Sequence, residues 1–127
     1  MDKRNGYEVK RFPFSTKRYC QTLDLKDDPR LIEEYKKRHN KRFYWVEVGE
    51  GLRSVGILDM EIYLFETRLF MIVETAMDFD WDYAFATLAK LPRQSEWEEY
   101  MSVFQKVKKT SNSADKWRLM ERIFELP

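Results

Sequence analysis

Two apolar stretches separated by a short polar turn lie in the middle of the sequence, and they constrain its fold more than any other feature. Residues 54–64 carry apolar side chains at spaced positions, and residues 68–75 contain the unbroken run LFMIV. The tripeptide FET at residues 65–67 lies between them. This pattern predicts a β-hairpin, and the unbroken run predicts that its second strand is buried on both faces.

The segment before the hairpin predicts a strand followed by a helix. Residues 19–25 alternate apolar and polar side chains, which is typical of a half-buried strand. Apolar residues then recur at spacings of three and four over residues 29–48, which predicts one long helix. Asp28 suits the N-cap and Pro29 the first helical position, and we expect Gly49 and Gly51 to end the helix.

The segment after the hairpin predicts two helices and a closing strand. An aspartate, Asp78 or Asp80, can cap a helix over residues 81–90. A proline then interrupts the pattern and opens a helix over residues 92–106. Residues 120–126 (MERIFEL) alternate again, which predicts a final strand.

The predicted order of elements indicates an α+β fold. Strand, helix, two strands, helices and strand form the split βαβ arrangement of a ferredoxin-like domain with a four-stranded antiparallel sheet. Helices cover one face of such a sheet, and face-to-face dimerisation into an α/β barrel would cover the other. We expect residues 1–17 to form an N-terminal arm and residues 18–127 to form a single domain.

Composition excludes several classes of function. The 23 basic and 22 acidic residues give a net charge of +1, which is no footprint for nucleic acid or an anionic membrane. No apolar run approaches the roughly 20 residues that span a bilayer. Cys20 is the only cysteine, so it cannot form an internal disulfide. We therefore expect a cytoplasmic protein.

The only histidine lies in the segment EEYKKRHN, four residues after a tyrosine. A separation of four places His39 and Tyr35 on one face of the predicted helix, and that face is otherwise apolar. A partly buried imidazole beside a phenol is a workable acid/base pair near neutral pH. The same pattern is also typical of a hydrogen-bonded histidine in a core or an interface, so the pattern alone leaves both roles open.

Other candidate residues are less specific. Trp97 in RQSEWEEYM can stack on the apolar face of a sugar or anchor the core. Glu61 and Glu74 lie on predicted strands and face either a pocket or solvent. One histidine and one cysteine provide no clustered metal ligands, and four glycines form no phosphate-binding loop. We expect neither a metal nor a cofactor.

Five segments in order resemble the L-rhamnose mutarotase family. They are RYCQTLDL, EEYKKRHN, GILDMEIYLFETRLFMIVE, QSEWEEYM and the closing FELP. The resemblance implies a small dimeric protein of ferredoxin-like fold. It also implies that His39 and Tyr35 are catalytic, with the histidine transferring protons, and that Trp97 stacks on the sugar. The family has a second tryptophan where this chain has Glu98, and we expect that carboxylate to accept hydrogen bonds from sugar hydroxyls.

The resemblance implies aldose mutarotation, which interconverts the α and β anomers of a 6-deoxy-hexose such as L-rhamnose or L-fucose. The reaction requires only proton transfer, which is consistent with a site that needs no metal or cofactor. Two alternatives remain open on the same scaffold, because fold alone does not decide function. They are a non-catalytic dimeric ligand-binding domain and a cofactor-free monooxygenase.

Overall fold

The computed structural model of the chain describes residues 3–107 and 116–127. Its elements are, in chain order, η1 (Lys3–Asn5), β1 (Thr16–Asp24), α1 (Pro29–Arg38), α2 (Val46–Ser54), β2 (Ile57–Phe65), β3 (Arg68–Ala76), α3 (Trp81–Leu88), α4 (Gln94–Ser102) and β4 (Arg118–Leu119). None of the helices in this part of the chain is long and apolar enough to cross a membrane.

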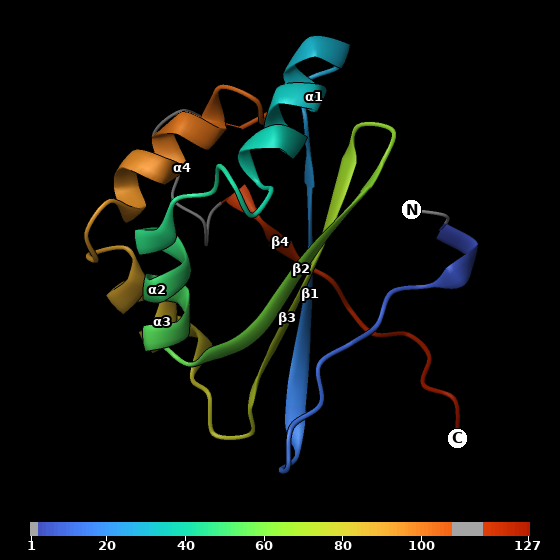
Figure 1. Ribbon diagram of the computed structural model, residues 1–127. Helices are drawn as coiled ribbons and strands as arrows, with labels where there is room; N and C mark the ends of the chain where they lie inside the picture. The colour runs from blue at the N-terminus through green and yellow to red at the C-terminus, as the bar shows by residue number, and fades with distance from the viewer. Residues whose placement is uncertain (1–2, 108–115) are drawn as a thin grey trace.

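The strands form one antiparallel sheet in the order β2-β3-β1-β4. This order, with α1 and α2 between β1 and β2 and with α3 and α4 between β3 and β4, confirms the predicted ferredoxin-like α+β fold. Figure 1 shows the helices on one face of the sheet and both chain ends on the other side. The sheet therefore has one covered face and one open face.

The core lies between the covered face and the helices. Leu69, Met71 and Val73 alternate along β3 and are buried, because period two sends every second side chain to the helices. Phe70 and Ile72 point to the open face and are only half-buried. The prediction of burial on both faces is therefore wrong for the single chain, which supplies a layer of helices on one side only.

The predicted helix over residues 29–48 is wrong as a single element. Asp28 caps α1 as expected, and its side chain accepts from the backbone N–H of Arg30. The helix ends at Arg38, because the Asn40 side-chain oxygen accepts hydrogen bonds from the next turn and offers the backbone an alternative to the helix. The chain turns over residues 40–44 and starts again as α2.

The two glycines expected to end that helix lie inside α2 instead. A Cβ at Gly51 would come within 3.3 Å of Leu91 Cδ1, and one at Gly49 would come within 3.0 Å of the Tyr44 ring. Both glycines therefore allow close approach of a neighbouring side chain. Close packing, rather than helix termination, explains why residues without a side chain occupy these positions.

The later helices agree with prediction more closely. Asp80 is the cap of α3, and its carboxylate accepts from the backbone N–H of Tyr83. The helix predicted over residues 92–106 is present but shorter, as α4. Its first residue follows Arg93, whose φ of +66° is a left-handed conformation that ends the preceding turn.

The predicted final strand over residues 120–126 is wrong for the single chain. Only the two residues of β4 pair with β1, and the tail that follows has no regular structure. Its side chains at Ile123, Phe124 and Leu126 are 87%, 71% and 82% exposed. The alternating pattern is therefore present, but this chain offers no strand beside it and no surface that covers its apolar residues.

Candidate active site

A cavity of about 420 Å³ opens between the covered face of the sheet and the helices. All four residues singled out from the sequence line it, namely Tyr35, His39, Trp97 and Glu98. A cavity of this volume falls within the range of small-molecule sites. The structure thus brings together, from two helices far apart in the sequence, the residues expected to act on one ligand.

The last turn of α1 positions the acid/base pair. Tyr35 is the buried residue of the helix, and His39 follows as its C-cap. Their ring centroids lie 4.2 Å apart with an interplanar angle of 36°. The spacing of four residues places both rings on the face that packs toward the cavity. The predicted pairing of these two side chains is present, and the break at Asn40 leaves it intact.

One hydrogen bond sets the tautomer of His39. Its Nδ1 lies 2.8 Å from the backbone carbonyl oxygen of Tyr35, which can only accept, so Nδ1 carries the proton. Nε2 of the neutral ring then keeps its lone pair. Burial lowers the pKa of His39 below its usual value, and the hydrogen bond to Tyr35 opposes part of that effect. The ring is therefore neutral at pH 7 and can accept a proton at Nε2.

The surroundings of Tyr35 keep its phenol protonated. Its ring is buried, and its hydroxyl accepts from Gln105 Nε2 at 3.4 Å. Burial raises the pKa of Tyr35 to about 12, with the Gln105 hydrogen bond acting weakly in the opposite direction. The phenol therefore stays protonated at neutral pH. It can donate a hydrogen bond, but it releases its proton less readily than a phenol in water.

Aromatic rings form one wall of the cavity. Trp97 meets His39 edge to face at 5.4 Å between ring centroids, and it meets Trp45 at 5.2 Å. The guanidinium of Arg93 lies 3.9 Å from the centroid of Trp45 and holds this second indole by a cation–π contact. Trp45 reaches the cavity because the chain turns after α1. The predicted continuous helix gave no sign of this position in the cavity.

A polar group on and beside α4 forms another part of the lining. It consists of Gln94, Glu98 and Lys116, and we refer to it as the polar wall. Gln94 Nε2 donates to Glu98 Oε1 at 3.1 Å, and Lys116 Nζ donates to the backbone carbonyl oxygen of Glu98. Burial lowers the pKa of Lys116, and the Glu98 carboxylate opposes part of that shift. Sequence reasoning found only Glu98, although the spacing of four between residues 94 and 98 is a readable signal.

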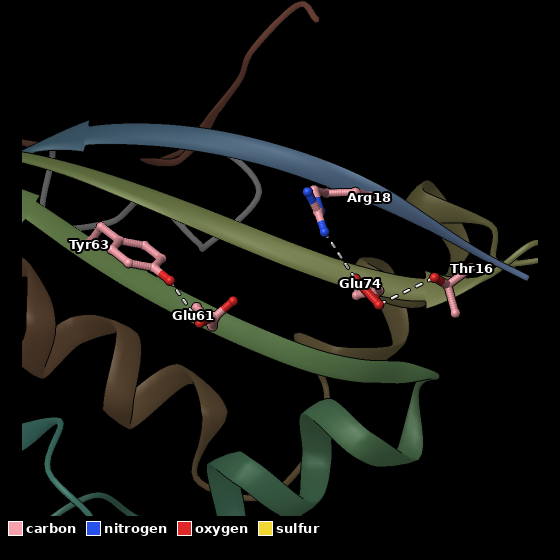
Figure 2. Close-up of polar contacts among 5 residues, drawn as sticks. All are labelled: Thr16, Arg18, Glu61, Tyr63 and Glu74. Atoms are coloured by element: carbon pink, nitrogen blue, oxygen red, sulfur yellow. Dashed lines mark hydrogen bonds and ion pairs between the residues drawn. The ribbon is translucent and has the colours of Figure 1, made fainter. Parts of the chain in front are cut away.

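Glu61 and Glu74 lie away from the cavity, on the open face of the sheet. Figure 2 shows Glu74 between Arg18 and Thr16, and the hydroxyl of Tyr63 donating to Glu61 at 2.8 Å. Both carboxylates thus have local partners on neighbouring positions of the sheet. Of the two roles left open for them, the outer strand face is the one that the structure shows.

The model of the L-rhamnose mutarotase family matches residues 18–126 of this chain. The chain belongs to the L-rhamnose mutarotase family. The resemblance inferred from the five segments is therefore confirmed, and so is the class of enzyme, an isomerase of the mutarotase type. The comparisons do not favour a ligand-binding domain or a monooxygenase.

Curated relatives of this mutarotase-family chain cover nearly its whole length. An L-fucose mutarotase of Xanthomonas campestris is 38% identical over 112 residues, which are 88% of this chain and 90% of the relative. A UPF0734 protein of Dictyostelium discoideum is 40% identical over 116 residues, which are 87% of this chain and 90% of the relative. The family assignment thus applies to most of the chain.

Solved structures support the fold. An L-rhamnose mutarotase of Formosa agariphila superposes with a TM-score of 0.65 at 19% identity, over 87% of this chain and 99% of the other. Tetracenomycin F2 cyclase of Streptomyces glaucescens superposes with a TM-score of 0.57 at 13% identity, over the same shares. At these identities the likeness concerns the fold alone, which other chemistry also uses.

Proposed function

We propose that this protein interconverts the α and β anomers of a 6-deoxy-hexose, either L-rhamnose or L-fucose. The observation that carries the proposal is the neutral imidazole of His39, with an accepting Nε2, at the wall of a 420 Å³ cavity that Trp97 also lines. The family of the chain and the L-fucose mutarotase among its relatives support the choice of sugars.

The reaction opens and closes the pyranose ring. His39 Nε2 removes the proton from the anomeric hydroxyl while the bond between C1 and the ring oxygen breaks, which leaves an aldehyde. The imidazolium returns that proton to the ring oxygen, so one residue serves as base and then as acid. After the carbonyl rotates, closure from its other face reverses these transfers and gives the second anomer. Positioned acid/base groups typically increase the reaction rate about 10²–10⁴-fold.

We assign Tyr35 a hydrogen-bonding role in this mechanism. A phenol with a pKa raised to about 12 keeps its proton, which suits it to orient the sugar oxygen rather than to give that proton away. Trp97 provides a flat surface for the apolar C–H face of the sugar. Glu98 accepts hydrogen bonds from hydroxyls. His39 thus moves the proton, and the other residues hold the sugar in place.

Exchange spectroscopy of the anomeric protons tests the proposal. L-rhamnose, L-fucose and D-galactose are each measured by NMR with and without the protein. Faster exchange of one 6-deoxy-hexose supports the proposal and ranks the substrates. Binding without faster exchange would support the ligand-binding domain instead. No acceleration with any of these sugars contradicts the proposed reaction.

We also propose that the protein is a homodimer in which two sheets pack face to face as an α/β barrel. Two features support this arrangement: the half-buried apolar residues on the open face of β3 and the exposed apolar tail after β4. Packing against a second copy of the chain would remove this apolar surface from water. Light scattering should give twice the 15.6 kDa mass of the chain. A single-chain mass at micromolar concentration would contradict it.

Two further expectations remain proposals. We propose that residues 1–17 are an arm attached to a single domain of residues 18–127, which the start of the family match at residue 18 supports. Within the arm, Tyr7 contacts Tyr63 edge to face and Lys10 pairs with Asp59 at 3.0 Å. We also propose a cytoplasmic location, which the single unpaired cysteine, Cys20, supports.

A further inference from the structure

The polar wall presents more hydrogen-bond acceptors than its own residues satisfy. A carboxylate only accepts, so Gln94 turns its NH₂ group toward Glu98 and leaves its carbonyl oxygen free. That oxygen, Gln94 Oε1, is buried and has no hydrogen-bond partner within the described part of the chain. The whole Gln94 residue is 3% exposed. A buried acceptor in this state destabilises the empty protein and favours a ligand that can donate to it.

Gln94 and Glu98 share one side of α4. Gln94 and Glu98 are four residues apart on the buried side of the helix, and both line the cavity. Ser102, one turn further on, uses its hydroxyl to donate to the Glu98 carbonyl oxygen at 2.9 Å. The backbone at Glu98 is therefore held by both Ser102 and Lys116, which restricts where its side chain can lie.

The charges of the wall identify the kind of donor that fits. Glu98 and Lys116 are 7% and 5% exposed, and they carry opposite charges. Lys116 lies close enough for the Glu98 carboxylate to act on its titration. The ammonium of Lys116 would repel a cationic donor, whereas it would not repel a neutral hydroxyl. The wall therefore fits neutral hydroxyl donors.

We propose that Gln94 and Glu98 bind hydroxyl groups of the sugar, and that this wall makes the protein select sugars that carry a hydroxyl there over analogues that lack it. The inference rests on the proposed function, because it names the specificity determinant of the same cavity. A site built to hydrogen-bond a hydroxyl strongly rejects the analogue without it, since buried polar groups are then left without partners. Lys116 acts only as a positioning residue.

Binding of L-fucose and L-rhamnose to four proteins tests the proposal. They are the wild type, Glu98→Gln, Gln94→Met and the control Glu99→Gln, which makes the same charge change at an exposed position of α4. Titration calorimetry measures affinity, and anomeric exchange measures turnover. We expect Glu98→Gln to weaken binding about 10–100-fold, as for loss of a hydrogen bond to a charged group. We expect kcat to change less than about threefold, which is typical of lost uniform binding.

Monodeoxy analogues of the better-bound sugar locate the contact. One analogue should bind the wild type about 10–100-fold more weakly, and Glu98→Gln should add little further loss with that analogue. Wild-type affinity in both Glu98→Gln and Gln94→Met would overturn the proposal, as would equal losses in the Glu99→Gln control. If Glu98→Gln does not fold, Gln94→Met decides the question alone.

The two readouts separate this inference from the proposed reaction. Sugar binding that depends on Gln94 and Glu98, without faster exchange, supports the binding wall and contradicts the mutarotase. Faster exchange by the wild type, together with unchanged sugar affinity in every variant, supports the mutarotase and overturns the proposed binding role of the polar wall. If the wild type binds no sugar at all, both proposals fail.

Discussion

His39 Nδ1 lies 2.8 Å from the carbonyl oxygen of Tyr35, one helical turn earlier on the same face of α1. This contact uses the last turn of a helix to fix an imidazole, because the carbonyl oxygens there have no intrahelical N–H partner. It selects the tautomer with a free Nε2 and limits rotation of the ring. The orientation of this imidazole is thus set by a main-chain carbonyl oxygen rather than by a carboxylate.

Replacement of His39 by alanine should remove the accelerated exchange. We expect a loss of about 10²–10⁴-fold in the exchange rate, because the base that moves the proton is absent. The ring is half-buried at a helix end, so the fold should persist. Anomeric exchange NMR measures the rate, and circular dichroism checks the fold. Lys37→Ala, at an exposed position of α1, is the matched control and should keep full activity.

The activity should depend on pH through the same residue. In the proposed mechanism the neutral form of His39 is the base, and burial lowers its pKa below the usual value of about 6.5. The exchange rate should therefore be constant above pH 6.5 and fall only as the pH drops through the lowered pKa. Tyr35, with a pKa of about 12, should cause no second change between pH 7 and about pH 10. A rate that still rises with pH between 6.5 and 7.5 would contradict the lowered pKa of His39.

Replacement of Tyr35 by phenylalanine separates two roles of the phenol. If the hydroxyl only donates a hydrogen bond, its removal should cost about tenfold in rate, well below the loss for His39→Ala. The change also leaves the Gln105 amide without its acceptor, so we expect the melting temperature to fall by a few degrees. Exchange rates and thermal unfolding measure the two effects. A loss as large as that of His39→Ala would show that the phenol itself transfers a proton.

Asn40 should control the aromatic wall through the turn that it stabilises. Its side-chain oxygen accepts from the backbone N–H groups of Arg42 and Phe43. Asn40→Ala should destabilise the protein by about 0.5–2 kcal/mol, as does loss of a helix cap, and it should weaken sugar binding because Trp45 follows this turn. Denaturant unfolding and calorimetry measure these effects. Asn40→Asp keeps the accepting oxygen and should behave as the wild type.

Local patterns predicted most of the covered side of the molecule. The hairpin, the capped starts of α1 and α3 and the pairing of Tyr35 with His39 all follow from spacing within one element. Features that depend on competition or on distant contacts escaped prediction. The side chain of Asn40 competes with continuation of a helix whose apolar spacing persists beyond it, and Gly51 responds to Leu91, a contact that periodicity does not reveal.

The residues of the site also fall into those that a local pattern or the family resemblance marks and those that it does not. His39 and Trp97 were found because a helix or a known family marks them. The place of Trp45 in the cavity could not be predicted, because the predicted helix continued past Asn40. Lys116 lines the cavity from a position just before β4 that no periodic pattern marks, and the free oxygen of Gln94 follows from a hydrogen bond that no pattern encodes.

The residues at α1 and those on α4 have different proposed roles in the cavity. The proposed base, His39, caps the end of α1, before the hairpin, whereas the proposed sugar-binding residues lie mostly on α4, after it. The two groups meet where the ring of Trp97 contacts that of His39. If the proposed roles hold, substitutions on α4 can change which sugar the cavity accepts while His39 and the reaction stay the same.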